Sequence, residues 1–190
     1  LDHRVKNMLA QILVLCFEAE SKSTADHDVI ESLRRRIQNF SAVHDVLSHE
    51  RATGVRCEEL TRLCLAPYES ESGSIFDVKA PDCRLVPKAS MFIAMVLNEL
   101  ATNAAKHGAI RHGGRVFVYW SIDDGSDPVL TLQWREQHSG PVPDMIVGGF
   151  GAQILLAGVP HELGGSAGFE HEAAGLVYTA TMPLKGVLQA

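Results

Sequence analysis

Three polar residues in the segment NELATNAAKHG could carry out chemistry together if the segment is helical. Glu99, Asn103 and Lys106 are spaced four and three residues apart, so a helix would place them on one face. A carboxylate can orient or deprotonate an attacking group, and an amide oxygen suits Mg²⁺, which takes few protein ligands. A helix face that is simply exposed to water can show the same pattern.

Glycines surround Phe150 where another helix is expected to begin. Gly148, Gly149 and Gly151 would let an anion approach the backbone, and the first N–H groups of a helix point at such a ligand. The alternative is a flexible helix entry without a ligand.

A histidine near the start of the chain has a suggestive context. In HRVKN, Asn7 would follow His3 by one helical turn, and Asp2 precedes it. A neutral imidazole nitrogen can attack a phosphoryl group and form a phosphoramidate. The alternative is an exposed histidine at a helix end.

The N-terminal part of the chain predicts two amphipathic helices. Apolar residues repeat with helical spacing up to about Lys22, and again from about His27 to Ser48. The loop segment SKSTAD separates them, which indicates an antiparallel hairpin. Because a lone hairpin buries little core, it needs the rest of the chain or a second copy as its partner.

From Arg56 onward the pattern changes to mixed helices and strands. CEELTRLCLAPY and the segment from Pro87 to His107 predict helices. The expected strands are SIFDVKA, CRLV, GRVFVYWSI, VLTLQWRE, SAGFEHE and GLVYTATMPL, the last two as a hairpin. QHSGPVPDMIVGG predicts a mobile loop, and the Gly164–Gly165 pair predicts a helix C-cap and turn. Trp134 alternates with Leu132 and Leu130, which indicates a buried strand residue.

The composition is typical of a soluble globular protein. Of the 190 residues, 46% are hydrophobic and 21% charged, with 17 basic and 23 acidic residues and a net charge of -6. That charge disfavours a nucleic-acid surface. No run is long and apolar enough to span a bilayer, and no signal peptide opens the chain. The four cysteines show no metal-ligand spacing, so we expect a reducing compartment, the cytoplasm.

The order of the motifs HRVKN, NELATNAAKHG, WREQHSGP and GFGAQIL…ELGG resembles a bacterial sensor histidine kinase of the HWE type. The resemblance covers essentially the whole chain. It implies an α+β protein: a dimerisation and histidine phosphotransfer hairpin over residues 1–52, then a catalytic ATP-binding domain over 53–190. The second domain would be a GHKL-type α/β sandwich, a mixed sheet covered by helices on one face. The chain opens in the middle of a helix, as a piece of a longer protein would, and the resemblance implies a sensor domain upstream of Leu1.

The resemblance also implies a reaction and its site. ATP would phosphorylate His3, the phospho-acceptor, and an aspartate of a response-regulator receiver domain would then take the phosphoryl group. Glu99 would be catalytic, and Asn103 would bind Mg²⁺. The remaining ATP-binding residues would be Lys106, His107, Glu136 toward the adenine amino group, Gly140, Gly149, Phe150 and Gly151. A homodimer through the hairpin is expected, and a monomer is the alternative.

Three positions depart from the family pattern. Asn98 stands where the family has histidine, and His107 stands where it has an aromatic residue. Pro160 lies inside a predicted helix and should break or kink it.

Two other functions fit parts of the same sequence. The chain could be a phosphotransfer or scaffold protein with a degenerate ATP-binding domain. It could also be an ATPase in which Glu99 activates water. Nucleotide binding would argue against the first, and the HRVKN segment argues against the second.

Overall fold

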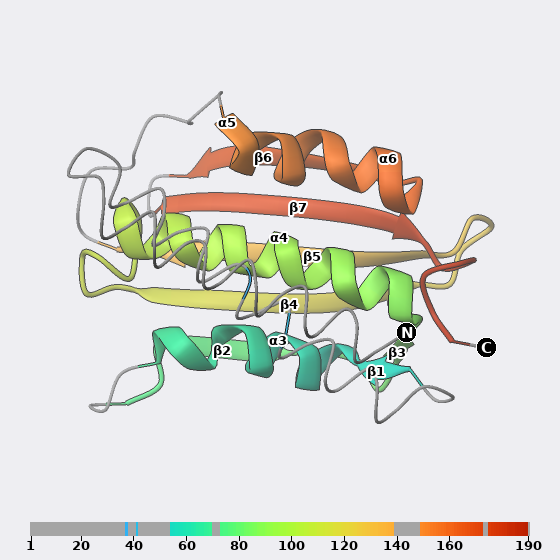
Figure 1. Cartoon of the computed structure of the whole chain (residues 1–190), viewed down its shortest axis with the longest axis horizontal. Coiled ribbons are helices and arrows are strands. Elements are labelled where there is room, and N and C mark those ends of the chain that lie inside the picture. The colour runs from blue at the N-terminus through green and yellow to red at the C-terminus, as the bar shows by residue number, and fades with distance from the viewer. Residues whose placement is uncertain are drawn as a thin grey trace.

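The C-terminal part of the chain is built on a mixed five-stranded sheet (Figure 1). The computed structural model describes residues 54–69, 73–138, 149–172 and 175–189, together with Ile37 and Ser41. Within them, the sheet has the order β2-β4-β5-β7-β6. β2 runs parallel to β4, and the other neighbouring strands are antiparallel. The strands are β2 (Phe76–Lys79), β4 (Arg115–Asp123), β5 (Val129–Gln137), β6 (Ser166–Glu172) and β7 (Gly175–Pro183).

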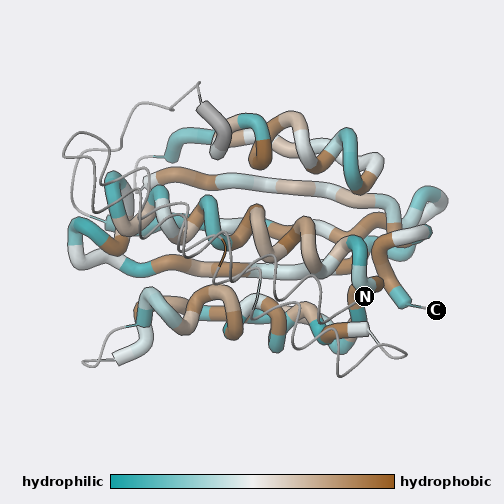
Figure 2. The backbone as a smooth tube through the Cα atoms, in the orientation of Figure 1, coloured by the Kyte–Doolittle hydropathy of each residue, from teal (hydrophilic) through white to brown (hydrophobic). Residues whose placement is uncertain are grey.

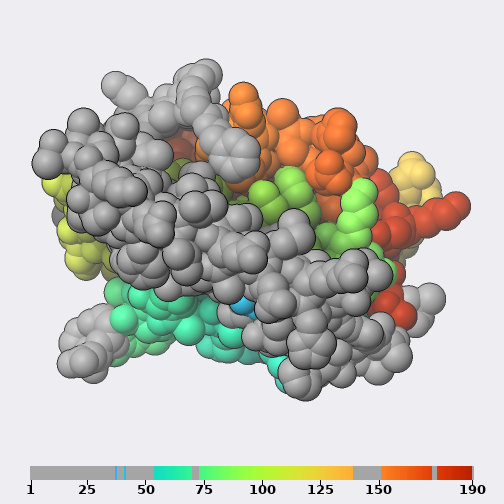
Figure 3. Space-filling model, in the orientation of Figure 1, coloured from blue at the N-terminus to red at the C-terminus, as the bar shows by residue number. Residues whose placement is uncertain are grey.

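Helices cover one face of this sheet, and α4 lies in the middle of them (Figure 1). Figure 3 shows from the same side part of the green surface of α4 beside the orange surface of the later helices. On one side α4 packs against α3, and on the other against a continuous helical run. The bounds are α3 (Cys57–Leu65), the 3-10 turn η1 (Ala66–Tyr68), α4 (Pro87–Lys106), and the run α5 (Gly149–Ala152), η2 (Gln153–Gly158) and α6 (Val159–Leu163). In the described part of the chain, no helix is long and apolar enough to cross a membrane.

The core lies between the helices and the inner face of the sheet. Val116, Val118 and Trp120 of β4 are buried there at alternate positions, and Leu132 and Trp134 continue the pattern on β5. Alternate side chains of a strand point to opposite faces, so this period places one row of each strand under the helices. Figure 2 shows the same concentration of hydrophobic residues along α4 and β4.

A buried hydrogen-bond chain fixes α3 to the sheet. The Trp120 indole N–H donates to the Thr61 hydroxyl at 3.0 Å, and that hydroxyl donates to the Cys57 carbonyl at 2.7 Å. Because the polar groups of Trp120 and Thr61 satisfy each other, the large indole can be buried without an unpaired donor.

The C-terminal tail fixes the beginning of α4. Pro87 occupies the first turn, where its missing N–H costs nothing, and the helix has no side-chain N-cap. Instead the Val86 N–H donates to the Val187 carbonyl at 2.9 Å, and Leu85 forms a β-bridge with Leu188. Leu85 belongs to β3 (Arg84–Leu85), which pairs antiparallel with β1 (Val55–Arg56).

Pro160 does not break the helical run, which continues from Gly149 to Leu163. The chain is instead π-helical over Gln153–Gly158 and returns to α-helix at Val159, with Pro160 in the first turn. In a π-helix the Leu155 carbonyl would accept from residue 160, but proline has no N–H. The buried Tyr178 hydroxyl donates to this carbonyl at 2.9 Å and takes the place of the missing donor.

The predicted fold class is confirmed, and the predicted helices and strands after residue 56 are found close to their expected bounds. Gly164 is the left-handed C-cap of α6, as predicted. The strand β1, the pairing of the C-terminal tail and the π-helical segment before Pro160 were not anticipated. The helical hairpin at 1–52 and the loop before Gly149 lie outside the described residues, and the domain boundary stays a prediction.

Tyr178→Phe should lower the free energy of unfolding by about 1–3 kcal/mol, because it leaves the Leu155 carbonyl buried without a donor. Chemical denaturation measures the loss. Tyr119→Phe is the matched control: its ring is half-buried on the other face of the sheet, so we expect less than about 0.5 kcal/mol. Equal effects of the two substitutions would show that the bond to Leu155 does not support the helical run.

Candidate functional site

The polar stripe of α4 is not a solvated helix face. Glu99 is only 2% exposed, and Asn103, one turn later, is half-buried. Lys106 is also half-buried, in the last turn, where its charge is favourable to the helix dipole. A carboxylate is placed in the interior only at a cost, so its burial on a face with an amide and an ammonium indicates a site.

The helical run begins against the Glu99 carboxylate. A Cβ atom built on Gly151 would lie 2.8 Å from Oε2 of Glu99. A larger residue at position 151 would force the Glu99 carboxylate to move, so glycine suits this close approach. The structure therefore brings together two predicted site residues, Glu99 and Gly151.

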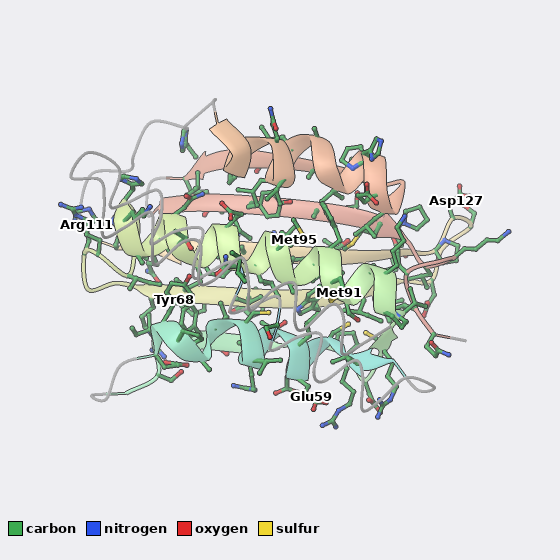
Figure 4. All side chains as sticks on the ribbon, in the orientation of Figure 1. Glu59, Tyr68, Met91, Met95, Arg111 and Asp127 are labelled. Carbon is green, nitrogen blue, oxygen red and sulfur yellow. The ribbon has the colours of Figure 1, made fainter. Side chains whose placement is uncertain are left out.

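The end of α4 is held by hydrogen bonds to its backbone carbonyls. The His107 N–H donates to the Asn103 carbonyl at 2.8 Å, and an Arg111 guanidinium nitrogen donates to the Lys106 carbonyl at 2.8 Å. The His107 side chain is exposed beyond the last turn. Figure 4 shows Arg111 beside this end of the helix. These bonds leave the side chains of Asn103, Lys106 and His107 to other partners.

Glu136 connects the turn after α4 to the sheet. Its Oε2 accepts from the Ala109 N–H at 2.7 Å, and its Oε1 accepts from the Trp134 indole N–H at 3.1 Å. The side chain is 3% exposed, and the preceding Gly108 leaves no room for a Cβ beside it. Burial raises the pKa of Glu136, while the bonds from Ala109 and Trp134 act in the opposite direction.

This positioning role of Glu136 was missed from the sequence, although Trp134 and Glu136 share one face of a strand. Each carboxylate oxygen can accept a second hydrogen bond. The expected contact of Glu136 with adenine therefore stays a prediction.

Asn98, which departs from the family pattern, is part of the core. The Tyr68 hydroxyl donates to Oδ1 of Asn98 at 3.0 Å and lies 2.9 Å from the Thr102 hydroxyl. Asn98 and Thr102 are four residues apart, so they share the face of α4 that meets η1. Asn98 is therefore matched to Tyr68, on a different side of the helix from the Gly151 contact.

Several predicted site residues cannot be placed. His3 and Gly140 lie outside the described residues. Gly149 and Phe150 belong to the backbone of α5, at its start, and their side chains are not described. The predicted arrangement of these residues stays a prediction.

The fold has known counterparts. The histidine kinase domain of a blue-light activated histidine kinase from Erythrobacter litoralis superposes with a TM-score of 0.63 at 20% identity, over 97% of this chain and 89% of that one. A structure described as the same kinase gives 0.67 at 18% identity, over 96% and 58%. The chain has the fold of a histidine kinase domain.

The sequence comparisons show which histidine kinases the chain resembles. Residues 1–82 match the family model for HWE histidine kinase. Blue-light-activated histidine kinases of Brucella ovis and Brucella anthropi are 24% and 25% identical, over 96% and 97% of this chain. The chain spans 38% of the length of these relatives. These matches agree with the resemblance to HWE histidine kinases that the motifs indicated.

Glu136→Gln should lower the free energy of unfolding by about 1–3 kcal/mol at neutral pH, because an amide has one acceptor oxygen for two buried N–H donors. Denaturation measures it. Glu170→Gln on the exposed side of β6 is the control, and we expect a change within about 0.5 kcal/mol. If Glu136→Gln and Glu170→Gln have the same stability, Glu136 does not hold the turn after α4.

The same variant should also change the pH dependence of stability. In the folded protein the pKa of Glu136 is raised above its ordinary value of 4.5. Protonation of Glu136 therefore stabilises the fold, fully at a pH below 4.5, and this stabilisation is lost as the pH rises through the folded pKa. The stability gap between wild type and Glu136→Gln should therefore widen as the pH falls toward 4.5. A gap that narrows would contradict the raised pKa.

Asn98→His should destabilise the fold by about 1–3 kcal/mol, since a larger ring must enter a filled position beside Tyr68. Thermal unfolding tests this, with Gln133→His on the half-buried outer position of β5 as the control. Unchanged stability would show that the position still accepts the family's histidine.

Proposed function

We propose that the chain is the core of a two-component sensor histidine kinase that phosphorylates His3 from ATP. The observation that carries the proposal is the buried Glu99 on α4, with Asn103 one turn later and the Gly151 backbone against its carboxylate. The family match and the histidine kinase relatives support the same activity.

The reaction needs an aligned nucleophile and stabilised phosphate charge. A nitrogen of the His3 ring attacks the γ-phosphorus, the new N–P bond forms as the bond to the ADP oxygen breaks, and ADP leaves. Glu99 orients the imidazole or accepts its ring proton. Lys106 and the backbone N–H groups at Gly149 and Gly151 contact phosphate.

The described residues fit a magnesium ion held lightly. Asn103 offers one amide oxygen from a rigid helix, beside the Glu99 carboxylate, and Mg²⁺ takes few protein ligands besides waters and phosphates. When bound, the ion neutralises charge on the phosphate oxygens. Glu136 and His107 would contact the nucleoside, with Gly140 and Phe150 in the segment that closes over it.

The wider setting belongs to the same proposal. The acceptor of the phosphoryl group is an aspartate of a response-regulator receiver domain, and residues 1–52 form the phosphotransfer hairpin through which two chains dimerise. Residues 53–190 form the catalytic domain. The core lies in the cytoplasm, and a sensor domain that precedes it in the full protein regulates it.

Asn103→Ala should reduce Mg²⁺-dependent labelling by ATP about 100-fold, which corresponds to losing a few kcal/mol of charge stabilisation, while the protein stays folded. Gln133→Ala removes an amide from the opposite face of the sheet and should leave labelling unchanged. If the two variants label alike, Asn103 is not a metal ligand.

His3→Ala should abolish labelling from ATP, and the label on the unmodified protein should be lost in acid and survive alkali, as a phosphoramidate does. The measurement is made on the 190-residue chain and on a version extended upstream of Leu1 by several helical turns, because the first turn of a helix frays. ATP binding with equal labelling of His3→Ala would reject this acceptor. Release of free phosphate with no labelled protein would indicate a water-using ATPase, and absence of nucleotide binding a scaffold.

A further inference from the structure

Two cysteines far apart in sequence meet where the catalytic domain begins. Cys57 and Cys83 are 26 residues apart, and their sulfur atoms lie 2.9 Å apart. Both are free cysteines in the structure.

The backbone places the two cysteines opposite each other. β1 and β3 pair Val55 with Leu85 and Arg56 with Arg84, so the next pair in the same register is Cys57 with Cys83. The Cys57 N–H donates to the Cys83 carbonyl at 3.1 Å, which continues the ladder by one step. Directly opposite residues of an antiparallel pair have Cα atoms about 4.5–5.5 Å apart, within the range that a disulfide spans.

The two thiols differ in environment. Cys57, the first residue of α3, is fully buried, whereas Cys83 is 8% exposed in the segment before β3. The hydrogen bond from Cys57 lowers the pKa of the Cys83 thiol, and the same bond together with burial raises the pKa of Cys57. Cys83 is thus the more exposed sulfur of the pair and the one that loses its proton more readily.

We propose that Cys57 and Cys83 form a reversible disulfide by exchange with small-molecule disulfides such as oxidised glutathione. The Cys83 thiolate attacks one sulfur of the glutathione disulfide, the S–S bond breaks, and one glutathione leaves as thiolate. The Cys57 sulfur then attacks the Cys83 sulfur of the mixed disulfide and gives up its proton, and the second glutathione leaves. Two cysteines are oxidised, and one disulfide is reduced to two thiols.

The crosslink acts at the entry to the domain and is independent of phosphoryl transfer. It joins the start of α3 to the segment before β3 and closes a loop that contains α3, η1 and β2. Residues 1–53 connect to this point through Gly54, whose positive φ and close contact with the Leu85 carbonyl already restrict it. Oxidation therefore crosslinks the catalytic domain directly after the point where residues 1–53 join it.

The test treats the reduced full chain with oxidised glutathione and locates disulfides by peptide mass mapping without reduction. We expect a Cys57–Cys83 linkage, a loss of two titratable thiols, a higher Tm and full reversal by dithiothreitol. Because the readout requires no nucleotide, the result stands whether or not the protein proves to be a kinase.

Three single variants make the test specific. Cys64→Ser is the matched control: Cys64 is buried, and burial raises its pKa to about 12, so the linkage should form unchanged. Cys57→Ser should stop the reaction at a stable mixed disulfide on Cys83, and Cys83→Ser should show no modification at Cys57. A lasting mixed disulfide in the unmodified chain, or a linkage of Cys57 or Cys83 to any other cysteine, would overturn the proposal.

Discussion

The position of the α4 end depends on one buried carboxylate. Glu136 accepts the Ala109 N–H from the turn after the helix and the indole N–H of Trp134 in its own strand. The two bonds offset part of the cost of burying the carboxylate, and they connect the turn after α4 to β5. Since Asn103 and Lys106 lie in the final turns of that helix, their placement follows from Glu136.

Local patterns were enough to predict most of the described fold. The alternation of Val116, Val118 and Trp120 identifies a half-buried strand from its sequence alone, because side chains of a strand change face at every residue. The spacing of Glu99 and Asn103 likewise requires only a helix to put them on one face. The order of the motifs then indicated the resemblance to HWE histidine kinases, with which the comparisons agree.

The sequence could not predict the contacts between distant segments. Nothing near Glu136 indicates that its partner is the backbone N–H of a residue 27 positions earlier. The fit of Gly151 against Glu99 is equally invisible, because glycines at a helix start have several uses. Pro160 was expected to break or kink its helix by a local rule, but a change to π-helix and the Tyr178 hydroxyl from β7 accommodate it. Each of these outcomes depends on which elements pack together, and that depends on the whole fold.

Neighbouring residues of α4 serve the core and the site separately. Asn98 faces Tyr68 and η1, whereas Glu99, rotated by about 100° on the helix, faces the start of the helical run. A change at position 98 therefore reaches the site only by shifting or rotating α4. The ends of that helix are fixed by independent contacts, Val86 with Val187 at one and Ala109 with Glu136 at the other. This arrangement explains how the chain can depart from the HWE pattern at Asn98 and keep Glu99 and Asn103 in place.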